Sequence, residues 1–274
     1  MAVPFVEAVV LGAIQGLTEF LPISSDGHLA LAQLFFGHEA ELALTVQLHV
    51  GTLLATALVL HRPLAPAVRD GLRALGSPAL FRETPGGRDA LFVITASVPT
   101  AILGLALKKS VEAWSSSPGI IGACLLGSAA AVGSTYFVGK GEERGRGELD
   151  VPSLAGAVVV GIAQGLAVLP GLSRSAMTLS SLLWLGVRPQ RAFELSFLMS
   201  IPAVAGAVLL EARHAFQGET SPVPILAGTA VAFGVGIFAL WALRGALAAG
   251  RLAWFAVYLV PVAVATAVWG YARP

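Results

Sequence analysis

Six apolar runs of about membrane length dominate the sequence and restrict what it can fold into. A bilayer core of roughly 30 Å needs about 20 apolar residues in a helix to cross it, and only helices and closed barrels satisfy the backbone at that depth. Charged residues make up 12% of the chain, against roughly 25% in a soluble domain. We therefore predict an all-α integral membrane protein. Its transmembrane helices are expected at about 42–60, 90–107, 118–138, 193–211, 222–243 and 252–271.

Two further apolar regions, at 3–21 and 152–169, break off instead of continuing as spans. The first breaks at LPISSDGH and the second at LPGLSRS. The apolar pieces that follow, at about 28–37 and 175–187, are too short to cross a bilayer. Irregular backbone at membrane depth is tolerated only inside the protein or beside a wet cavity. We predict two re-entrant broken-helix hairpins whose breaks lie within the membrane.

The two broken regions resemble each other, which indicates an internal repeat. GAIQGL at 12–17 matches GIAQGL at 161–166 with an offset of 149. The proline and the serine that follow match with an offset of 148, after a one-residue gap: Pro22 with Pro170, and Ser25 with Ser173. Each half then holds one hairpin and three spans, and because three is odd the second half enters from the opposite side. The pattern predicts an inverted-topology repeat.

The repeat also sets the expected domain organisation. We predict a single membrane domain over 1–274, with repeat halves at about 1–138 and 152–274. A charged loop at 139–151 would join them.

Positive charge is distributed unevenly between the predicted loops, and this sets the orientation. The side that we predict to be cytoplasmic carries Arg62, Arg69, Arg73, Arg82, Arg88, Lys140, Arg144, Arg146, Arg188, Arg191, Arg244 and Arg251. The other side carries Lys108, Lys109, Arg213 and Arg273. Both termini are then expected outside the cell.

Composition excludes several other classes of function. The net charge of +1 provides no basic surface for nucleic acid. Cys124 is the only cysteine, so the chain has no intramolecular disulfide. The small residues of GACLLGSAAAVG at 122–133 permit a homodimer, but they equally suit packing within the chain.

The two breaks predict an anion site. Each leaves the N-terminus of a half-helix at depth, where free N–H groups and the helix dipole attract negative charge. Arg174 is the one Lys or Arg left inside the membrane, and its planar guanidinium suits phosphate. A phosphate or diphosphate between the two tips would also offset the free energy of burying Arg174.

Hydrolysis of such a ligand requires a nucleophile, proton transfer and charge neutralisation. Ser24 or Ser25 could supply a hydroxyl, and His28 could act as base or acid or attack phosphorus itself. Glu19 lies on the same helix face as Gln15. Its carboxylate could orient His28 or hold a divalent cation.

Structural roles are the alternative for the same polar residues. Serines at the breaks could cap the half-helices, a carboxylate could pair with the arginine, a threonine could bond to its own helix, and glutamines could join helices. The residues concerned are Ser24, Ser25, Ser173, Ser175, Glu19, Arg174, Thr178, Gln15 and Gln164. His28 could likewise be a hydrogen-bonded structural residue. We interpret Gln47 and His49 as packing residues of the span at 42–60.

Three segments resemble a known family. QGLTEFLPISSDGHL at 15–29 and LAVLPGLSRSAMT at 166–178 resemble the two signature motifs of the undecaprenyl-diphosphate phosphatase family, also called the bacitracin-resistance family. RAFELSFLMSIPAVAGA at 191–207 resembles the segment after the second motif. The resemblance covers nearly the whole chain. It implies removal of one phosphate from a polyprenyl diphosphate in the bacterial inner membrane, with dependence on Mg²⁺ or Ca²⁺.

The family's functional residues can be placed on this chain by motif position. They fall on Gln15, Glu19, Ser25, His28, Ser173, Arg174 and Thr178. Two positions depart from the family pattern: Asp26 stands where threonine is usual, and Ala176 where glycine is usual. Asp26 could cap the following half-helix, which we favour, or face the site and share a cation with Glu19.

The resulting hypothesis is a lipid diphosphatase with its site reached from the outer face. Ser25, activated by His28, is the preferred nucleophile, with His28 itself or a water molecule as alternatives. Arg174 stabilises the phosphoryl group, and Glu19 holds part of the cation. Substrate binding is assigned to Gln15, Ser24, Ser173, Ser175 and Thr178. The alternative function is a transporter or flippase that carries a polyprenyl phosphate on the same anion site.

Overall fold

The computed structural model describes residues 4–37, 42–138, 149–215 and 222–272, and within them the chain is all-helical. Its helices are α1 (Phe5–Thr18), α2 (Ser25–Phe35), α3 (Leu42–Val59), α4 (His61–Ala74), α5 (Leu80–Glu83), α6 (Pro85–Trp114), α7 (Pro118–Ser134), α8 (Leu154–Leu166), α9 (Arg174–Trp184), α10 (Pro189–Ala215), α11 (Pro222–Ala248) and α12 (Phe255–Ala272). Short 3₁₀ turns, η1 (Thr135–Phe137) and η2 (Leu252–Trp254), follow α7 and precede α12. The predicted fold class is confirmed.

Some predicted features fall outside the described residues. They are most of the loop at 139–151, with Lys140, Arg144 and Arg146, and also Arg273 and the side chain of Arg213.

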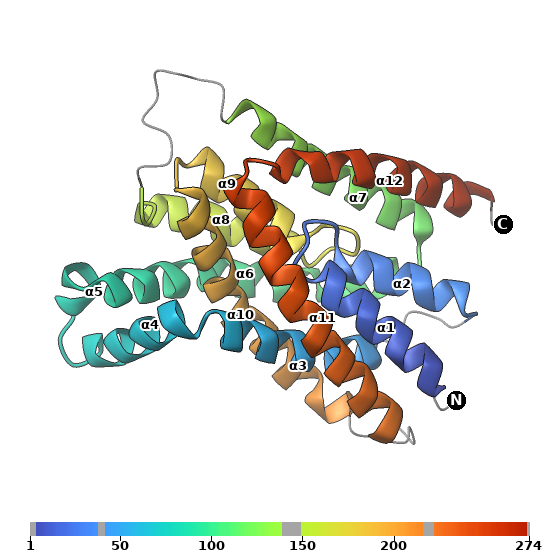
Figure 1. The fold of residues 1–274 in the computed structure, drawn as a ribbon, viewed down its shortest axis with the longest axis horizontal. Coiled ribbons are helices and arrows are strands. Elements are labelled where there is room, and N and C mark those ends of the chain that lie inside the picture. Colours follow the sequence, from blue (N-terminus) through green and yellow to red (C-terminus); the bar gives the residue numbers. More distant parts are fainter. Residues whose placement is uncertain (1–3, 38–41, 139–148, 216–221, 273–274) are drawn as a thin grey trace.

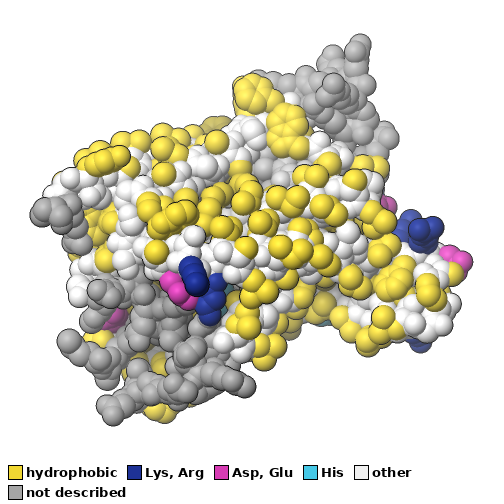
Figure 2. Space-filling view, turned by 180° about the vertical axis from the view of Figure 1, so that it is seen from behind, with side chains coloured by type: hydrophobic (Ala, Val, Ile, Leu, Met, Phe, Trp, Pro, Cys, Tyr) yellow, Lys and Arg dark blue, Asp and Glu magenta, His cyan; other side chains and the backbone are white. Residues whose placement is uncertain are grey.

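Five of the described helices are long and apolar enough to cross a bilayer: α6, α7, α10, α11 and α12. The sixth candidate is α3 taken together with α4, which meet at an angle of 87°. These helices match the six predicted spans. Figure 2 shows the rear face as a broad apolar surface, with charged side chains gathered toward its two ends.

The two broken regions form helix pairs that do not continue through the break. The first helix of each pair, α1 or α8, is too short to cross a bilayer. Residues 19–24 connect α1 to α2, and residues 167–173 connect α8 to α9. The two connecting loops meet in the middle of the molecule (Figure 1). Ser175 of α9 donates a hydrogen bond to the carbonyl of Leu21 across this junction, at 3.2 Å.

Helix packing follows the repeat. Helix α1 packs on α11, and its counterpart α8 packs on α6. Helix α3 packs on α11, and its counterpart α10 packs on α6, while α3 contacts α10 and α7 contacts α12. Helices α4 and α5 are an insertion in the first half, because only six residues separate α10 from α11. They lie at the opposite end of the molecule from the start of α1 and the end of α12 (Figure 1).

Matched glycines allow these matched contacts. A Cβ on Gly12 of α1 would lie 2.2 Å from the carbonyl oxygen of Gly228 on α11. A Cβ on Gly161 of α8 would lie 2.2 Å from the carbonyl oxygen of Ala96 on α6. Small residues let apolar helices approach this closely. Gly122 of α7 approaches α12 in the same way, so the run at 122–133 packs within the chain, and the homodimer stays a prediction.

The structure corrects the predicted alignment of the repeats. The N-cap of α2 is Ser24, whose hydroxyl accepts from the N–H of Gly27 at 3.3 Å. The N-cap of α9 is Ser173, whose hydroxyl accepts from the N–H of Ala176 at 3.3 Å. These caps are 149 residues apart, the same offset as the two GxxQGL segments, so no gap is needed. Each half-helix begins at the residue after its capping serine, which is Ser25 in the first half and Arg174 in the second.

Candidate active site

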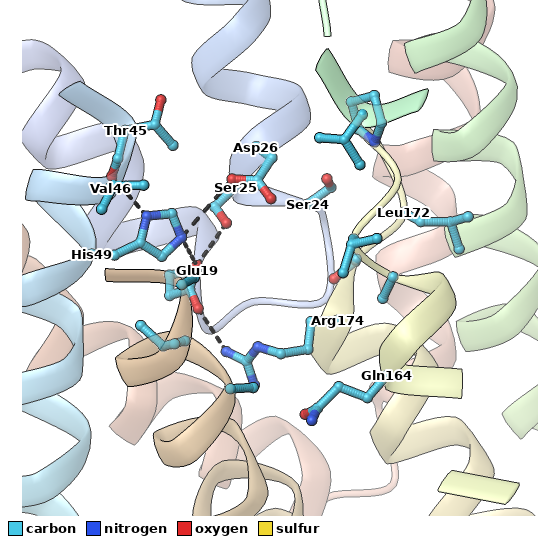
Figure 3. A pocket seen from close by; sticks show the side chains of 18 of the residues that line it. Glu19, Ser24, Ser25, Asp26, Thr45, Val46, His49, Gln164, Leu172 and Arg174 are labelled. Carbon is cyan, nitrogen blue, oxygen red and sulfur yellow. Dashed lines mark hydrogen bonds and ion pairs between the residues drawn. The ribbon is translucent and has the colours of Figure 1, made fainter. Parts of the chain in front are cut away.

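A cavity of about 250 Å³ lies where the two broken regions meet. One wall is polar and carries Glu19, Ser24, Ser25, Asp26, Thr45, His49, Ser173 and Arg174. The rest is largely apolar and comes from the α8–α9 loop, the C-terminal part of α6, and α10. Figure 3 shows the side chains of Ser25 from α2, His49 from α3 and Arg174 from α9 converging on one point.

The carboxylate of Glu19 lies at that point. Its Oε1 accepts a hydrogen bond from Nη2 of Arg174 at 2.7 Å, and its Oε2 accepts from the hydroxyl of Ser25 at 2.7 Å. Gln15 donates to the same Oε2 at 3.3 Å. Glu19 thus bridges the first residues of both half-helices, and its pairing with Arg174 confirms the ion pair that the sequence left as an alternative.

The fourth partner of Glu19 is His49, from α3. Its Nε2 lies 3.3 Å from Oε2 of Glu19 and 3.9 Å from Oδ1 of Asp26, and its Nδ1 lies 2.7 Å from the carbonyl oxygen of Thr45. Carbonyl and carboxylate oxygens accept hydrogen bonds and do not donate them. Both ring nitrogens therefore face acceptors, and this geometry favours the doubly protonated, positive ring. It places a second cation beside Glu19, opposite Arg174 (Figure 3).

Arg174 is held in place by two contacts and keeps one donor free. Besides the ion pair with Glu19, its guanidinium carbon lies 5.5 Å from the ring centroid of Phe197. Phe197 is fully buried and packs edge-on against Phe20 and Phe193. Nη1 of Arg174 is one of the few buried polar atoms without a partner among the described residues. A buried, unpaired donor on a cavity wall is suited to an anionic ligand.

Ser25 reaches Glu19 because the backbone before it turns sharply. Ser24 has φ 73° and ψ 102°, and among the described residues it is the one non-glycine with a positive φ. Such a conformation is strained by roughly 1–3 kcal/mol and clusters at functional sites.

The structure does not bring His28 to Ser25. Its Nδ1 lies 2.8 Å from the carbonyl oxygen of Ser24, and its Nε2 lies 2.8 Å from the hydroxyl of Tyr258 on α12. The ring does not line the cavity. The hydroxyl of Ser25 donates its hydrogen bond to Glu19 instead.

Three other residues predicted to bind substrate lie outside the cavity lining. Gln15 bonds to Glu19 and, at 3.5 Å, to Thr52 of α3. Ser175 donates a hydrogen bond to the carbonyl of Leu21 in the α1–α2 loop. Thr178 donates to the carbonyl of Arg174 in its own helix at 2.9 Å. These are the structural roles named as alternatives. Ser24 and Ser173 do line the cavity while also capping their half-helices.

The favoured capping role of Asp26 is wrong. Ser24 provides the cap of α2, and Asp26 lines the cavity near His49 with its side chain 47% exposed. The N-cap position precedes the first helical residue, and Asp26 is already inside the helix. Figure 3 shows its carboxylate on the side of α2 that faces His49.

The side chains do not form a ready cation site. Among the described residues, no three His, Cys, Asp or Glu side chains are grouped so that they could hold a metal ion. Both oxygens of Glu19 already accept hydrogen bonds from Arg174 and Ser25. Glu19 and Asp26 therefore do not fit a preformed cation site.

Sequence interpretation missed two residues of the cavity. His49 was assigned to packing, although an ionisable residue inside a span indicates a functional site by default. Gln164, assigned to helix contacts, does bond to Thr100 of α6 at 3.3 Å and to the carbonyl of Met199 at 3.4 Å. It also lines the cavity, and its buried Oε1 has no partner in the described structure.

Comparison with known proteins identifies the family of the chain. The sequence model of the family "Bacitracin resistance protein BacA" matches residues 8–265. Undecaprenyl-diphosphatase of Desulforapulum autotrophicum is 38% identical, covering 97% of this chain and 98% of the relative. The enzymes of that name from Desulfosudis oleivorans and Bacteroides fragilis are 41% and 35% identical, covering 92% and 96% of this chain and 94% and 97% of the relatives. The chain belongs to the BacA family.

Proposed function

We propose that this chain is an undecaprenyl-diphosphatase, which hydrolyses undecaprenyl diphosphate to the lipid monophosphate and phosphate. Relatives of that name align with it over nearly their whole length. The observation that carries the proposal is the 2.7 Å hydrogen bond from the hydroxyl of Ser25 to Glu19, beside the unpaired donor of Arg174. Nucleophile, base and anion-binding group meet in one cavity.

In the first step, Oγ of Ser25 attacks the terminal phosphorus and its proton passes to Oε2 of Glu19. The phosphoanhydride bond breaks, the lipid monophosphate leaves, and Glu19 returns the proton to the leaving phosphate oxygen. In the second step, water attacks the phosphoserine and gives a proton to Glu19, the bond from phosphorus to Oγ breaks, and Glu19 passes the proton to Oγ of Ser25 as phosphate departs. Arg174 stabilises charge on the phosphoryl oxygens in both steps. His49 holds Glu19 toward the serine and offsets negative charge in the cavity.

The apolar part of the cavity suits the prenyl tail. It continues from the polar wall along Val111 of α6 and along Ala203, Ala207 and Val208 of α10. A lipid whose diphosphate lies at Arg174 would place its first isoprene units against these small side chains. We assign lateral entry of the substrate to the space between α6 and α10.

The same helix supports a proposal for the orientation of the chain in the membrane. Val111 and Ser115 line the cavity near the C-terminal end of α6, close in sequence to Lys108 and Lys109, whereas α4 and α5 lie at its other end. We propose a multi-pass protein of the bacterial cytoplasmic membrane with both termini outside and the cavity reached from the outer face. Single cysteines in 61–89, in a Cys124→Ser background, should be shielded from an impermeant thiol reagent in intact cells, and cysteines near Lys109 should react. The opposite labelling would reverse the orientation.

The flippase alternative is not favoured, because a carrier needs the anion site but neither a nucleophile nor a base. Phosphate release from undecaprenyl diphosphate by the detergent-purified protein decides between them. Wild type should release phosphate and Ser25→Ala should not. Transport without phosphate release would support the carrier. A parallel measurement with EDTA tests the dependence on Mg²⁺ or Ca²⁺ that the family resemblance implies.

A further inference from the structure

The inserted helix α4 leaves α3 at an angle of 87°. If α3 crosses the bilayer, α4 therefore lies along its surface. One face of α4, with Ala67, Asp70 and Ala74, is buried. It packs against the start of α6, where a Cβ on Gly71 would lie 2.8 Å from that of Ala90. This contact fixes which sides of α4 face outward.

The outward sides carry two different stripes. Val68, Leu72 and Leu75 are 52%, 65% and 73% exposed, and their spacing of four and three residues places them on one line. Arg62, Arg69 and Arg73 form the second stripe and are also exposed. Arg69 follows Val68 and Arg73 follows Leu72, so the stripes lie about 100° apart around the helix. A helix at a membrane surface needs this arrangement, with apolar residues in the acyl boundary and arginines at headgroup level.

Charge around α4 favours an anionic surface. Arg82 of α5 and Arg88 at the start of α6 are exposed as well. Of the carboxylates in 61–89, Asp70 is buried and pairs with Arg69, Asp89 is buried and pairs with Arg191 of α10, and only Glu83 is exposed. The other arginines of this segment therefore leave an excess of positive charge. Figure 2 shows arginine or lysine beside apolar side chains at this end of the molecule.

We propose that α4 and α5 form an interfacial element that binds anionic phospholipid headgroups of one leaflet. The stripe of Val68, Leu72 and Leu75 enters the acyl boundary, and the arginines contact the headgroup phosphates. This inference concerns lipid binding and does not depend on the proposed enzyme activity.

An environment-sensitive NBD fluorophore on a single cysteine tests this, in a Cys124→Ser background and with one protein copy per nanodisc. NBD at Leu72→Cys should emit at shorter wavelength than NBD at Arg69→Cys and should be quenched by spin-labelled lipid. Adding phosphatidylglycerol to phosphatidylcholine nanodiscs should move the NBD emission at Leu72→Cys to still shorter wavelength. Replacing Arg62, Arg69 and Arg73 together by glutamine should remove that further shift.

Equal emission at the two positions would overturn the insertion of the apolar stripe. If the emission shift at Leu72→Cys is the same with and without phosphatidylglycerol, and is unchanged in the glutamine variant, the recognition of anionic lipid is overturned. A shift that needs two protein copies per disc would show that a second copy of the chain covers this face, and would also overturn the proposal.

A second inference rests on the strained turn at Ser24 and on the proposed function. The carbonyl of Ser24 accepts from the backbone N–H of His28 at 3.2 Å and lies 2.8 Å from Nδ1 of the same residue. A carbonyl only accepts, so Nδ1 must carry the proton. Nε2 of the neutral ring is then an acceptor, which the hydroxyl of Tyr258 can satisfy at 2.8 Å. Tyr258 thus selects the tautomer that holds the turn.

We infer that Tyr258, through His28 and Ser24, is a positioning residue for the nucleophile Ser25. The ring of Tyr258 also stacks on His28, with centroids 5.9 Å apart and an interplanar angle of 16°. The pair joins α12 of the second half to α2 of the first. Strained turns persist only where the surroundings hold them, and this pair supplies two such contacts.

Steady-state hydrolysis of undecaprenyl diphosphate by point variants tests the inference. Tyr258→Phe keeps the stacked ring and removes the hydroxyl, and should lower kcat about tenfold, the effect of losing one ordinary hydrogen bond. KM and the pH profile should not change. Tyr271→Phe is the matched control, because Tyr271 lies on the same helix and is 91% exposed. His28→Gln, which can still donate to Ser24, should keep more activity than His28→Ala.

A wild-type kcat in Tyr258→Phe would overturn the positioning role. A shifted pH profile would also overturn it, because that result assigns proton transfer to His28. An inactive wild-type protein would instead overturn the proposed function, so the two failures can be told apart.

Discussion

The two broken-helix regions share a scaffold and differ in chemistry. Each has a GxxQGL helix, a break and a capping serine at the same offset, and each packs on the matching helix of the other half. The first half supplies Glu19, Ser25 and, from α3, His49. The second half supplies Arg174, supported by Phe197 of α10. Packing keeps the symmetry, whereas the few residues that face the cavity diverge.

The division of labour explains why Glu19 is central. Its counterpart at the same offset is Val168, which gives the second half no carboxylate. One carboxylate therefore orders the starts of both half-helices, accepting from Ser25 and from Arg174. We propose that the halves are complementary: the first performs nucleophilic and proton-transfer chemistry, and the second binds the anion.

The largest expected effect separates the serines of the two halves. Ser25→Ala should abolish phosphate release and leave substrate binding largely intact, since Arg174 remains. Ser173→Ala removes a cap, which is worth about 1 kcal/mol of stability, and should leave most of the activity. Single-turnover assays and thermal melts of both variants measure this. A dead Ser173→Ala beside an active Ser25→Ala would move the nucleophile to the second half.

Arg174→Lys tests the anion-binding half. The variant keeps the charge but loses the planar fork that reaches Glu19 and the ligand together. We expect a loss of roughly 2–4 kcal/mol in transition-state stabilisation, on the scale of one strong anion-stabilising donor. The measurement is kcat/KM on undecaprenyl diphosphate. Near-normal turnover would show that positive charge alone is sufficient there.

His49→Leu tests whether α3 belongs to the catalytic half. The substitution removes the donor to Glu19, and a hydrogen bond to a charged group contributes about 1.5–3 kcal/mol. We expect kcat to fall accordingly, with the protein still folded. Gln47→Leu on the same helix is the control and should remain close to wild type. If the two substitutions lower kcat equally, His49 has only a packing role.

The matched glycines test the shared scaffold. Gly12→Ala and Gly161→Ala each place a methyl group 2.2 Å from a carbonyl oxygen of the facing helix. Overpacking of this kind destabilises by about 1–3 kcal/mol, and the two variants should lose similar stability in thermal melts. Gly234→Ala is the control, because its Cβ would meet open space. A large difference between the first two would mean that the halves are not packed equivalently.

Asp26→Thr should have the smallest effect. Oδ1 of Asp26 lies 3.9 Å from Nε2 of His49, and the Asp26 side chain is about half exposed. Their interaction therefore contributes little to the stability of the site, about 0.5–1 kcal/mol. Most activity should remain when the usual family residue is restored. Because Asp26 and Glu19 do not form a preformed cation site among the described residues, the divalent-cation requirement of the variant in an EDTA titration should match that of wild type. A folded but inactive variant would make Asp26 a primary catalytic group.

Much of the architecture could be predicted from the sequence, because it follows from local patterns. Apolar runs of membrane length indicate helices, and proline and polar residues mark the breaks. The two GxxQGL segments indicate the repeat. Arg174 could be recognised from the sequence as the candidate anion-binding group, because it is the one Lys or Arg left within the predicted membrane segments.

The contacts within the site were decided by the tertiary structure. Glu19 and Arg174 are 155 residues apart, and His49 comes from a helix that shows no motif. Which histidine reaches the carboxylate depends on how α3 and α12 pack around the first break. That packing places His49 at Glu19 and draws His28 to Tyr258. Hydrogen bonds act over about 3 Å, so a sequence pattern can identify the candidate groups, but only the three-dimensional packing determines which of them meet.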